Sequence, residues 1–260
     1  MKFRIALIQM DSQEDKTANV EKALELCHKA IHEGAEWILL PEVFNQRSDT
    51  LPIRFRKEPI PGPSLTPFMK LGVWILAGSI CEESKNRKAY NTSVLINPDG
   101  LITAQYRKIH LFDVRVGQTL FKESGMFLPG DTPTLARMPF GEVGLSICFD
   151  LRFPELYRHY SRRGAVALTV PSSFTRPTGE KHWEVLLRAR AIENQCYVLA
   201  PNQTGMGPNQ IPSYGNSMVV GPTGEILARA SEKETVIVVD LDFTSLENLR
   251  KNFPIIPVLP

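Results

Sequence analysis

The chain has 260 residues, of which 43% are hydrophobic and 22% are charged, and its formal net charge is +2. This composition is typical of a globular protein, and its scattered basic residues form no stripe that would indicate a nucleic-acid partner. No apolar run reaches membrane-spanning length, so no membrane partner is expected either. The N-terminus starts a strand directly, without a signal-peptide layout. The cysteines have neither metal-ligand spacing nor the density of a disulfide framework: Cys27, Cys81, Cys148 and Cys196. We therefore expect a protein of the reducing cytoplasm that holds no metal.

The first half of the sequence alternates strand patterns with helix patterns. Strands are expected at residues 3–10, 37–40 and 73–77, because these segments are short and apolar. Helices are expected at residues 19–33, where Gly34 ends the pattern, and at residues 67–71. Residues 90–106 have the pattern of a β-hairpin whose turn is Asn97-Pro-Asp-Gly100.

The second half begins with an apolar strand at residues 143–147, directly before Cys148. Asp150 is then predicted as the N-cap of a helix that has Pro154 in its first turn. A further helix is expected at residues 176–194, a late strand at 236–241 and a Pro-rich tail at 253–260.

Four segments of the first half recur in the second half in the same order. The pairs are 5–11 with 144–150, 34–44 with 164–174, 74–77 with 197–200, and 90–100 with 214–224. One such match could be chance, but four in order indicate an internal duplication. Each half predicts a sheet with helices on one face and a bare apolar face on the other. Two such halves packed sheet against sheet give an α/β fold, a four-layer α-β-β-α sandwich, which we expect to be one domain over residues 1–260.

Cys148 lies where a buried strand turns into a helix, at the carboxyl end of the sheet. Helix amides and a basic neighbour would lower the pKa of its thiol from about 8.5 and create a nucleophile. The alternative is a buried structural cysteine, and this segment alone does not decide between them. Glu42 also follows a strand, whereas the repeat counterparts of Glu42 and Cys148 are Ser172 and Gln9. The residues capable of chemistry are thus distributed asymmetrically over one crevice.

Three motifs resemble those of the nitrilase (carbon–nitrogen hydrolase) superfamily. They are Leu40-Pro-Glu-Val-Phe44, Tyr106-Arg-Lys-Ile-His-Leu-Phe-Asp113 and Ser146-Ile-Cys-Phe-Asp-Leu-Arg-Phe-Pro-Glu155. The resemblance covers nearly the whole chain, and residues 178–195 resemble the branch of omega-amidase and deaminated-glutathione amidase. It implies that Glu42 is the general base, Lys108 the electrostatic stabiliser and Cys148 the nucleophile. It also places the second glutamate of the family at Glu123, which would orient Lys108.

Amide hydrolysis requires these residue types on chemical grounds as well. It needs a nucleophile, a base that activates it, and positive charge where the carbonyl oxygen becomes an anion. Lys108 and the backbone N–H of Phe149 can supply that charge. His110 and His182 are interpreted as structural, because the site already has a base.

Arg152, four residues after Cys148, is a candidate for binding a substrate carboxylate. The alternative is that it pairs with a carboxylate of the protein, and the sequence leaves both open. The expected substrate-binding residues are Arg152, Phe149, Ser172 and Phe174.

The sequence therefore predicts a cofactor-free amidase that releases ammonia from a small carboxylated amide through a cysteine thioester. Two alternatives remain: a nitrilase or N-carbamoyl hydrolase of the same superfamily, and a non-catalytic interaction protein on the same fold. The family resemblance further implies a homo-oligomer, a dimer or a multiple of one, with helix 176–194 suited to the interface.

Overall fold

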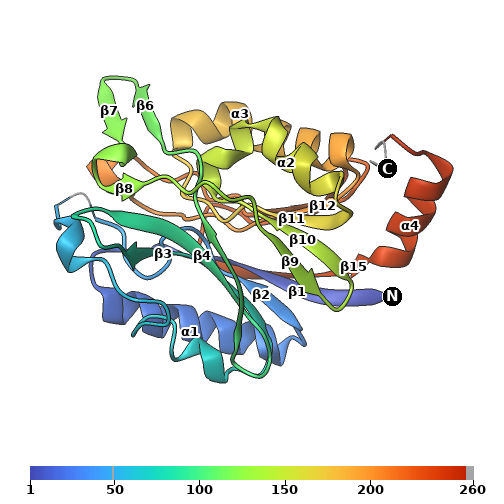
Figure 1. The fold of residues 1–260 in the computed structure, drawn as a ribbon, viewed down its shortest axis with the longest axis horizontal. Helices are drawn as coiled ribbons and strands as arrows, with labels where there is room; N and C mark the ends of the chain where they lie inside the picture. Colours follow the sequence, from blue (N-terminus) through green and yellow to red (C-terminus); the bar gives the residue numbers. More distant parts are fainter. Residues whose placement is uncertain (49, 256–260) are drawn as a thin grey trace.

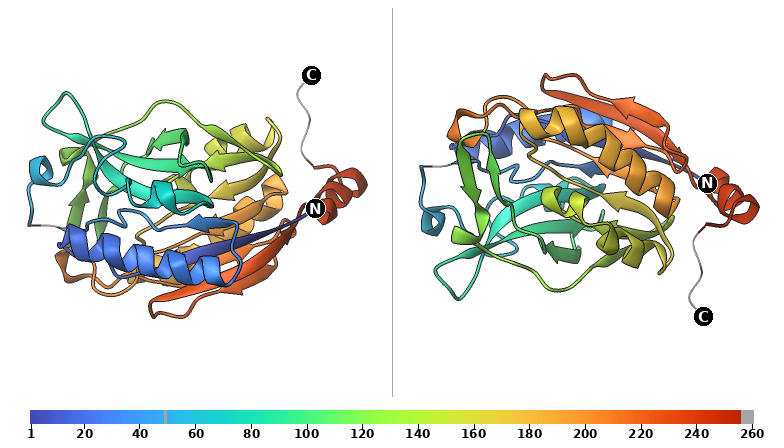
Figure 2. Two further views of the ribbon diagram at one scale, coloured as in Figure 1. Left: turned by 90° about the horizontal axis from the view of Figure 1, so that it is seen from below. Right: turned by 90° about the horizontal axis from the view of Figure 1, so that it is seen from above.

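The computed structural model describes residues 1–48 and 50–255, which form two β-sheets stacked face to face (Figure 1). Helix α1 (Lys16–His32) covers the outer face of one sheet, and helices α2 (Pro154–Ser161) and α3 (Arg176–Asn194) cover the outer face of the other. Figure 2 views the molecule from below, with α1 nearest the viewer, and from above, with α2 and α3 nearest the viewer. The expected α-β-β-α sandwich is confirmed.

The first sheet has seven strands, arranged in the order β15-β1-β2-β3-β4-β5, with β8 paired to β4. Their bounds are β1 Lys2–Gln9, β2 Trp37–Leu39, β3 Trp74–Glu83, β4 Ala89–Ile96, β5 Ile102–Arg107, β8 Phe127–Leu128 and β15 Thr235–Asp242. β1, β2 and β3 are parallel, as expected of strands joined by helical crossovers. β15 returns from the end of the chain and pairs antiparallel with the whole of β1.

The second sheet has six strands in the order β14-β13-β12-β11-β10-β9. Their bounds are β9 Leu135–Met138, β10 Gly141–Leu145, β11 Ala165–Thr169, β12 Tyr197–Ala200, β13 Met218–Val220 and β14 Ile226–Arg229. β10, β11 and β12 are parallel and correspond to β1, β2 and β3 of the first sheet. This matched topology agrees with the internal duplication predicted from the sequence.

Three smaller features complete the described fold. β6 (Asp113–Val116) and β7 (Thr119–Lys122) form a separate hairpin that projects at the upper left of Figure 1. Short 3₁₀ helices are η1 Ile53–Phe55, η2 Phe68–Lys70, η3 Glu123–Gly125, η4 Cys148–Arg152 and η5 Pro208–Gln210. Helix α4 (Phe243–Asn252) follows β15 and is capped by Asp242, whose Oδ1 accepts from Thr244 N at 3.1 Å.

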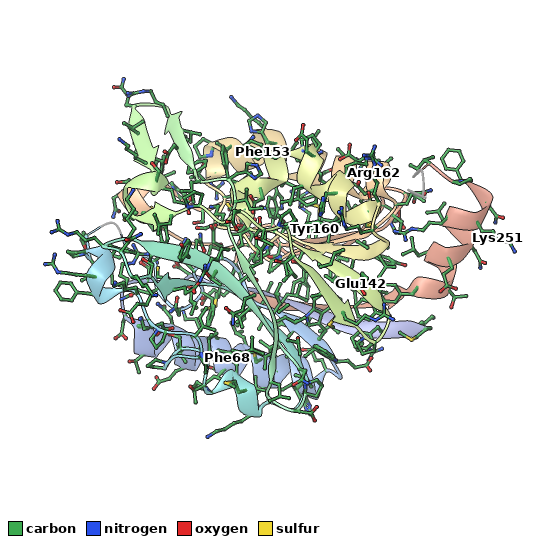
Figure 3. All side chains as sticks on the ribbon, in the orientation of Figure 1. Phe68, Glu142, Phe153, Tyr160, Arg162 and Lys251 are labelled. Carbon is green, nitrogen blue, oxygen red and sulfur yellow. The ribbon has the colours of Figure 1, made fainter. Side chains whose placement is uncertain are left out.

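The alternation of side chains along β1 supplies both layers of the core. Ile5 and Leu7 face the second sheet, whereas Ala6 and Ile8 pack toward α1. Figure 3 shows the side chains that fill these layers, with Phe68 on the α1 side and Tyr160 on the α2 side. β1 is therefore buried on both faces, which explains why its sequence is almost continuously apolar.

β3 and α4 differ from the sequence-based expectation. β3 extends to Glu83, because its apolar pattern continues beyond Gly78. Gly78 itself fits the strand because a side chain there would collide with the carbonyl oxygens of Leu40 and Pro41. Helix α4 was not anticipated. Of the expected Pro-rich tail, residues 256–260 lie outside the described residues.

Candidate active site

Four predicted residues meet at one end of the two sheets. Glu42 follows β2, Lys108 follows β5, Cys148 follows β10, and Glu123 begins η3. All four line a cavity of about 330 Å³, and the first three are almost fully buried. The carboxyl ends of parallel strands from both halves meet at this cavity, as α/β folds favour.

Lys108 lies between two carboxylates. Its Nζ donates to Glu42 Oε1 at 2.9 Å and to Glu123 Oε2 at 2.9 Å, with a second contact to Glu123 Oε1 at 3.1 Å. Burial alone would lower the pKa of Lys108, but the charges of Glu123 and then Glu42 outweigh it and raise that pKa well above its usual value. Lys108 is therefore a fixed positive charge in the cavity wall.

The backbone around Cys148 differs from the predicted helix start. Cys148 to Arg152 form the 3₁₀ turn η4, and α2 begins only at Pro154. The Asp150 side chain does not cap α2; it accepts a hydrogen bond from Ile147 N at 2.9 Å and closes the turn behind Cys148. Pro154 explains the delayed start, because it disfavours helical backbone at the residue before it.

Two residues at the chemically important part of the cavity wall have left-handed backbone conformations. Cys148 and Val43 each have a φ of 48°. This region is sterically unfavourable for residues with a Cβ, above all for a β-branched valine. The strain lies at the nucleophile candidate and directly after the base candidate, which is typical of functional sites.

The pKa of the Cys148 thiol is raised well above its usual value, contrary to the sequence-based expectation. Burial is the largest cause, and the negative charge of Glu42 adds to it, while Lys108 and the Ser173 backbone N–H oppose them. The expectation was wrong because it weighed the favourable helix amides without the desolvation of a thiol beside a carboxylate. The surroundings of the Cys148 thiol therefore favour its neutral form beside the Glu42 carboxylate.

Asp150 organises the layer behind Cys148. It is fully buried and accepts from Tyr106 Oη at 2.7 Å and from His110 N at 2.9 Å, and it contacts His110 Nδ1 at 2.7 Å. The His110 ring stacks on Phe153 with ring centroids 3.6 Å apart. His110 is not among the residues that line the cavity, so its contacts agree with a structural role.

Arg152 lines the cavity beside Cys148 without a carboxylate partner among the described residues. Its Nη1 lies 3.3 Å from His182 Nδ1, and its Cζ lies 5.7 Å and 5.4 Å from the ring centroids of Phe149 and Phe174. Burial lowers the pKa of Arg152, and burial followed by the charge of Arg152 lowers the pKa of His182. The alternative in which Arg152 pairs with an acidic residue of the protein is thus not observed.

Of the other three residues expected to bind substrate, two line the cavity and one does not. Phe149 and Phe174 line the cavity, but Ser172 does not. Ser172 is fully buried, and its Oγ donates to Val170 O at 2.9 Å. The one-residue difference arises because successive residues of an extended segment face opposite sides, so Ser173 rather than Ser172 faces the cavity.

Asn91 of β4 is a cavity residue that the sequence interpretation missed. Its Nδ2 donates to Glu42 Oε1 at 2.9 Å and to Glu123 Oε1 at 3.2 Å. The only available signal was the internal repeat, in which the residue matching Asn91 is Gly215. A side chain present in one half alone marks a position that the shared fold does not require.

A thiol, a carboxylate and a lysine at the strand ends of an α-β-β-α sandwich together define a class of hydrolases of carbon–nitrogen bonds. The family model of the carbon-nitrogen hydrolases matches residues 4–251, and the chain belongs to this family. It is an amidase of the nitrilase superfamily that acts on carbon–nitrogen bonds other than peptide bonds.

The chain is similar to named relatives over almost its whole length. It is 38% identical over 259 residues to the omega-amidase of Xenopus tropicalis, covering 98% of this chain and 94% of the relative. It is 40% identical over 265 residues to the deaminated glutathione amidase of Mus musculus, covering 96% and 81%. The crystal structure of Saccharomyces cerevisiae Nit3 superposes with a TM-score of 0.88 at 34% identity, covering 98% of this chain and 96% of that one.

Two negative findings apply to the described residues. None of their helices is both long and apolar enough to cross a membrane. Nor do they contain a group of three or more His, Cys, Asp or Glu side chains that could hold a metal ion. That catalysis needs neither metal nor cofactor stays a prediction.

Proposed function

We propose that this amidase hydrolyses the terminal amide of a small carboxylated substrate to the acid and ammonia, through a thioester at Cys148. The observation that carries the choice of substrate is Arg152, a half-buried guanidinium in the cavity wall that has no carboxylate partner among the described residues. A partly buried cation beside an apolar pocket favours a ligand that supplies an anion.

In the acylation step, Glu42 removes the proton of the Cys148 thiol as Sγ attacks the amide carbonyl carbon. The carbonyl oxygen becomes an anion that Lys108 Nζ and the backbone N–H of Phe149 stabilise. When the tetrahedral intermediate collapses, the carbon–nitrogen bond breaks. Glu42 returns its proton to the leaving nitrogen, which departs as ammonia.

In the deacylation step, Glu42 takes a proton from water, which attacks the thioester carbon. The carbon–sulfur bond breaks, the thiol regains the proton, and the carboxylic acid leaves. Glu123 holds Lys108 in place through both steps, because its two oxygens contact Nζ at 3.1 and 2.9 Å. One base thus serves both half-reactions.

The substrate carboxylate is proposed to bind Arg152. A guanidinium can hold a carboxylate through two charge-assisted hydrogen bonds, and Phe149 and Phe174 flank the space beside it. The named relatives act, by their names, on omega-amides and on deaminated glutathione. We infer the same substrate class here, a small acid with a distal amide.

The test compares a dicarboxylic monoamide with its methyl ester on the wild type and on Arg152→Ala. The wild type should prefer the acid by about 30-fold or more in kcat/KM, since removing one partner of a buried charge pair costs about 2–5 kcal/mol. The variant should lose most of this preference. If both enzymes treat acid and ester alike, Arg152 is structural and the pocket binds a neutral amide.

A product screen separates this proposal from the related activities. Ammonia released from omega-amides but not from nitriles supports it, whereas carbon dioxide released from carbamoyl amino acids would indicate an N-carbamoyl hydrolase. Absence of any turnover, together with a Cys148 that alkylating agents do not modify, would favour a non-catalytic protein.

We also propose that the enzyme is a cytoplasmic homo-oligomer, a dimer or a multiple of one. Helix α3 exposes Val185 and Ile192, which are apolar, near Arg188, and this combination is typical of interfaces. All four cysteines are free thiols, which suits a reducing compartment. Light scattering at micromolar concentration should show a multiple of 29.2 kDa, and Val185→Asp should dissociate it. A wild type that is only monomeric would refute the oligomer.

A further inference from the structure

Asn91 contacts three of the proposed active-site residues through two of its atoms. Its backbone carbonyl accepts from Lys108 N at 2.8 Å, and its side-chain Nδ2 donates to Glu42 and to Glu123 at 2.9 and 3.2 Å. Among the described residues, Lys108 is the other side chain that bonds to both carboxylates. The two carboxylates are therefore bridged twice, once by an ammonium group and once by a neutral amide.

The charge of the cluster explains why a neutral bridge suits this position. Among the described residues, Lys108 already supplies a cation that contacts both Glu42 and Glu123. A second cation in place of Asn91 would stabilise the Glu42 carboxylate further and weaken it as a base. An amide instead supplies two N–H donors that stabilise the anions without adding formal charge.

The orientation of the Asn91 side-chain amide leaves its oxygen buried without a hydrogen bond, which is unfavourable for stability. Asn91 Oδ1 is buried and has no hydrogen-bond partner among the described residues. Turning the amide over would bring this oxygen against two carboxylates, so the N–H donors must face the site. Unpaired buried acceptors are rare in proteins and call for an explanation. The matching residue of the other half is Gly215, so the strand itself does not require an asparagine.

We propose that Asn91 is a positioning residue, which holds the carboxylates of Glu42 and Glu123 in register on Lys108 so that Glu42 can act as the base that activates Cys148. This inference rests on the proposed function for the role of Glu42, and it goes beyond it by assigning a further residue. The charged and titratable groups of the described cavity that act on Glu42 and its neighbours include Lys108, Glu123, Cys148, Arg47 and Arg152.

The test uses Asn91→Leu, which removes the donors at similar volume, and Asn91→Asp, which replaces the amide by a third carboxylate. Both should lower kcat by about 10²-fold with little change in KM, because misplacing a catalytic group costs about that much. Both should also move the acid limb of the pH profile to higher pH, since losing a donor or adding a negative charge raises the pKa of a carboxyl group. The shift should be larger for Asn91→Asp.

The matched control is Thr92→Val. Thr92 is the next residue of β4, and its Oγ1 donates to the carboxylate of Glu82 at 2.6 Å, away from the cavity lining. The Thr92→Val substitution removes a comparable buried hydrogen bond and should leave kcat and the pH profile unchanged. If the Asn91 variants match Thr92→Val in both readouts, Asn91 only stabilises the strand and the proposal is overturned.

The rate of Cys148 alkylation by iodoacetamide as a function of pH keeps this inference separate from the choice of substrate. It needs no amide substrate, so it reports on Glu42 even if the carboxylated amides prove wrong. The Asn91 variants should alkylate more slowly at neutral pH, with an acid limb moved upward. An unchanged alkylation profile in Asn91→Asp would refute the role of Asn91, whatever the substrate screen shows.

Discussion

Gln9 and Cys148 occupy matching places in the two halves of the molecule, after corresponding strands, but their side chains make opposite uses of that place. Gln9 is fully buried, and its Nε2 donates to the carbonyls of Ser231 and Lys233 at 2.6 and 2.7 Å, while its Oε1 accepts from Ser217 N at 2.8 Å. Cys148 instead faces the cavity. The duplicated fold supplies equivalent positions, of which one joins the halves and the other presents a thiol.

Glu42 and Ser172 repeat this contrast. Glu42 contacts Lys108 in the cavity, whereas Ser172 bonds to a nearby backbone carbonyl outside it. The strained backbone follows the same division, because Val43 and Cys148 have positive φ angles and their counterparts Ser173 and Gln9 do not. Such strain costs about 1–3 kcal/mol at each residue. In each of these two pairs, the residue with the positive φ is the one at or directly beside the proposed chemistry.

The largest expected effect is the loss of the thiol. Cys148→Ala should abolish ammonia release, and iodoacetamide should modify Cys148 before the fully enclosed Cys27, Cys81 and Cys196. Peptide mass mapping after partial alkylation measures this order. Cys196→Ala is the control and should retain activity. Turnover by the Cys148→Ala enzyme would exclude a thioester.

Loss of the base or of the lysine should come next. Glu42→Gln should lower kcat by about 10²–10⁴-fold, the usual contribution of a general base, and Lys108→Met by at least about 10²–10³-fold. Ser172→Ala, at the matching place in the other half, should have no comparable effect on kcat. A burst of ammonia equal to the amount of enzyme in Glu42→Gln would show that another group serves acylation.

The comparison can be sharpened with a thiol that lies in the second half and outside the cavity. Burial raises the pKa of Cys196 to about 12. Between an unfolded-state pKa of about 8.5 and this value, only the unfolded chain loses the proton, so stability falls as the pH rises, by about 1.4 kcal/mol per pH unit. Urea unfolding of Cys196→Ala should show a slope between about pH 9 and 11 that is smaller by this amount. An unchanged slope would mean that the folded protein ionises Cys196 readily.

The smallest expected effect concerns backbone strain. Val43→Gly should leave the free energy of unfolding within about 1 kcal/mol of the wild type, because relief of about 1–3 kcal/mol offsets the lost packing and the added chain entropy. Ser173→Gly gains no such relief and should be destabilised. Activity of Val43→Gly should fall nonetheless, since Glu42 loses a fixed neighbour. A stability loss above about 2 kcal/mol would show that the positive φ of Val43 is not strained.

Much of the fold followed from local patterns in the sequence. The helix at 176–194 was predicted with the observed bounds, and α1 was predicted to within three residues at its start. The four matched segments also predicted the sandwich, because they indicate two similar sheets that each have an apolar face to bury. Helix α4 was missed, because it is short and buries only Phe243 and Leu246.

The site was harder to predict where it depends on three-dimensional contacts. Glu42, Lys108, Glu123 and Cys148 stand in motifs, and the structure brings them together. The direction of the Cys148 pKa shift was not predictable from the motif, because it depends on how deeply the thiol is enclosed. Asn91 belongs to none of the motifs. That Ser173 lines the cavity instead of the predicted Ser172 depends on which side of an extended segment faces the cavity.

The pairing of β15 with β1 also constrains the order in which the chain can fold. Residues 235–242 complete the sheet that residues 2–9 begin, so a strand made early in synthesis waits for one made almost last. Contacts between such distant residues slow folding, and until they form, β1 has an open, strongly apolar edge. We therefore expect the first half to need chaperones that cover this edge until residues 235–242 have been made.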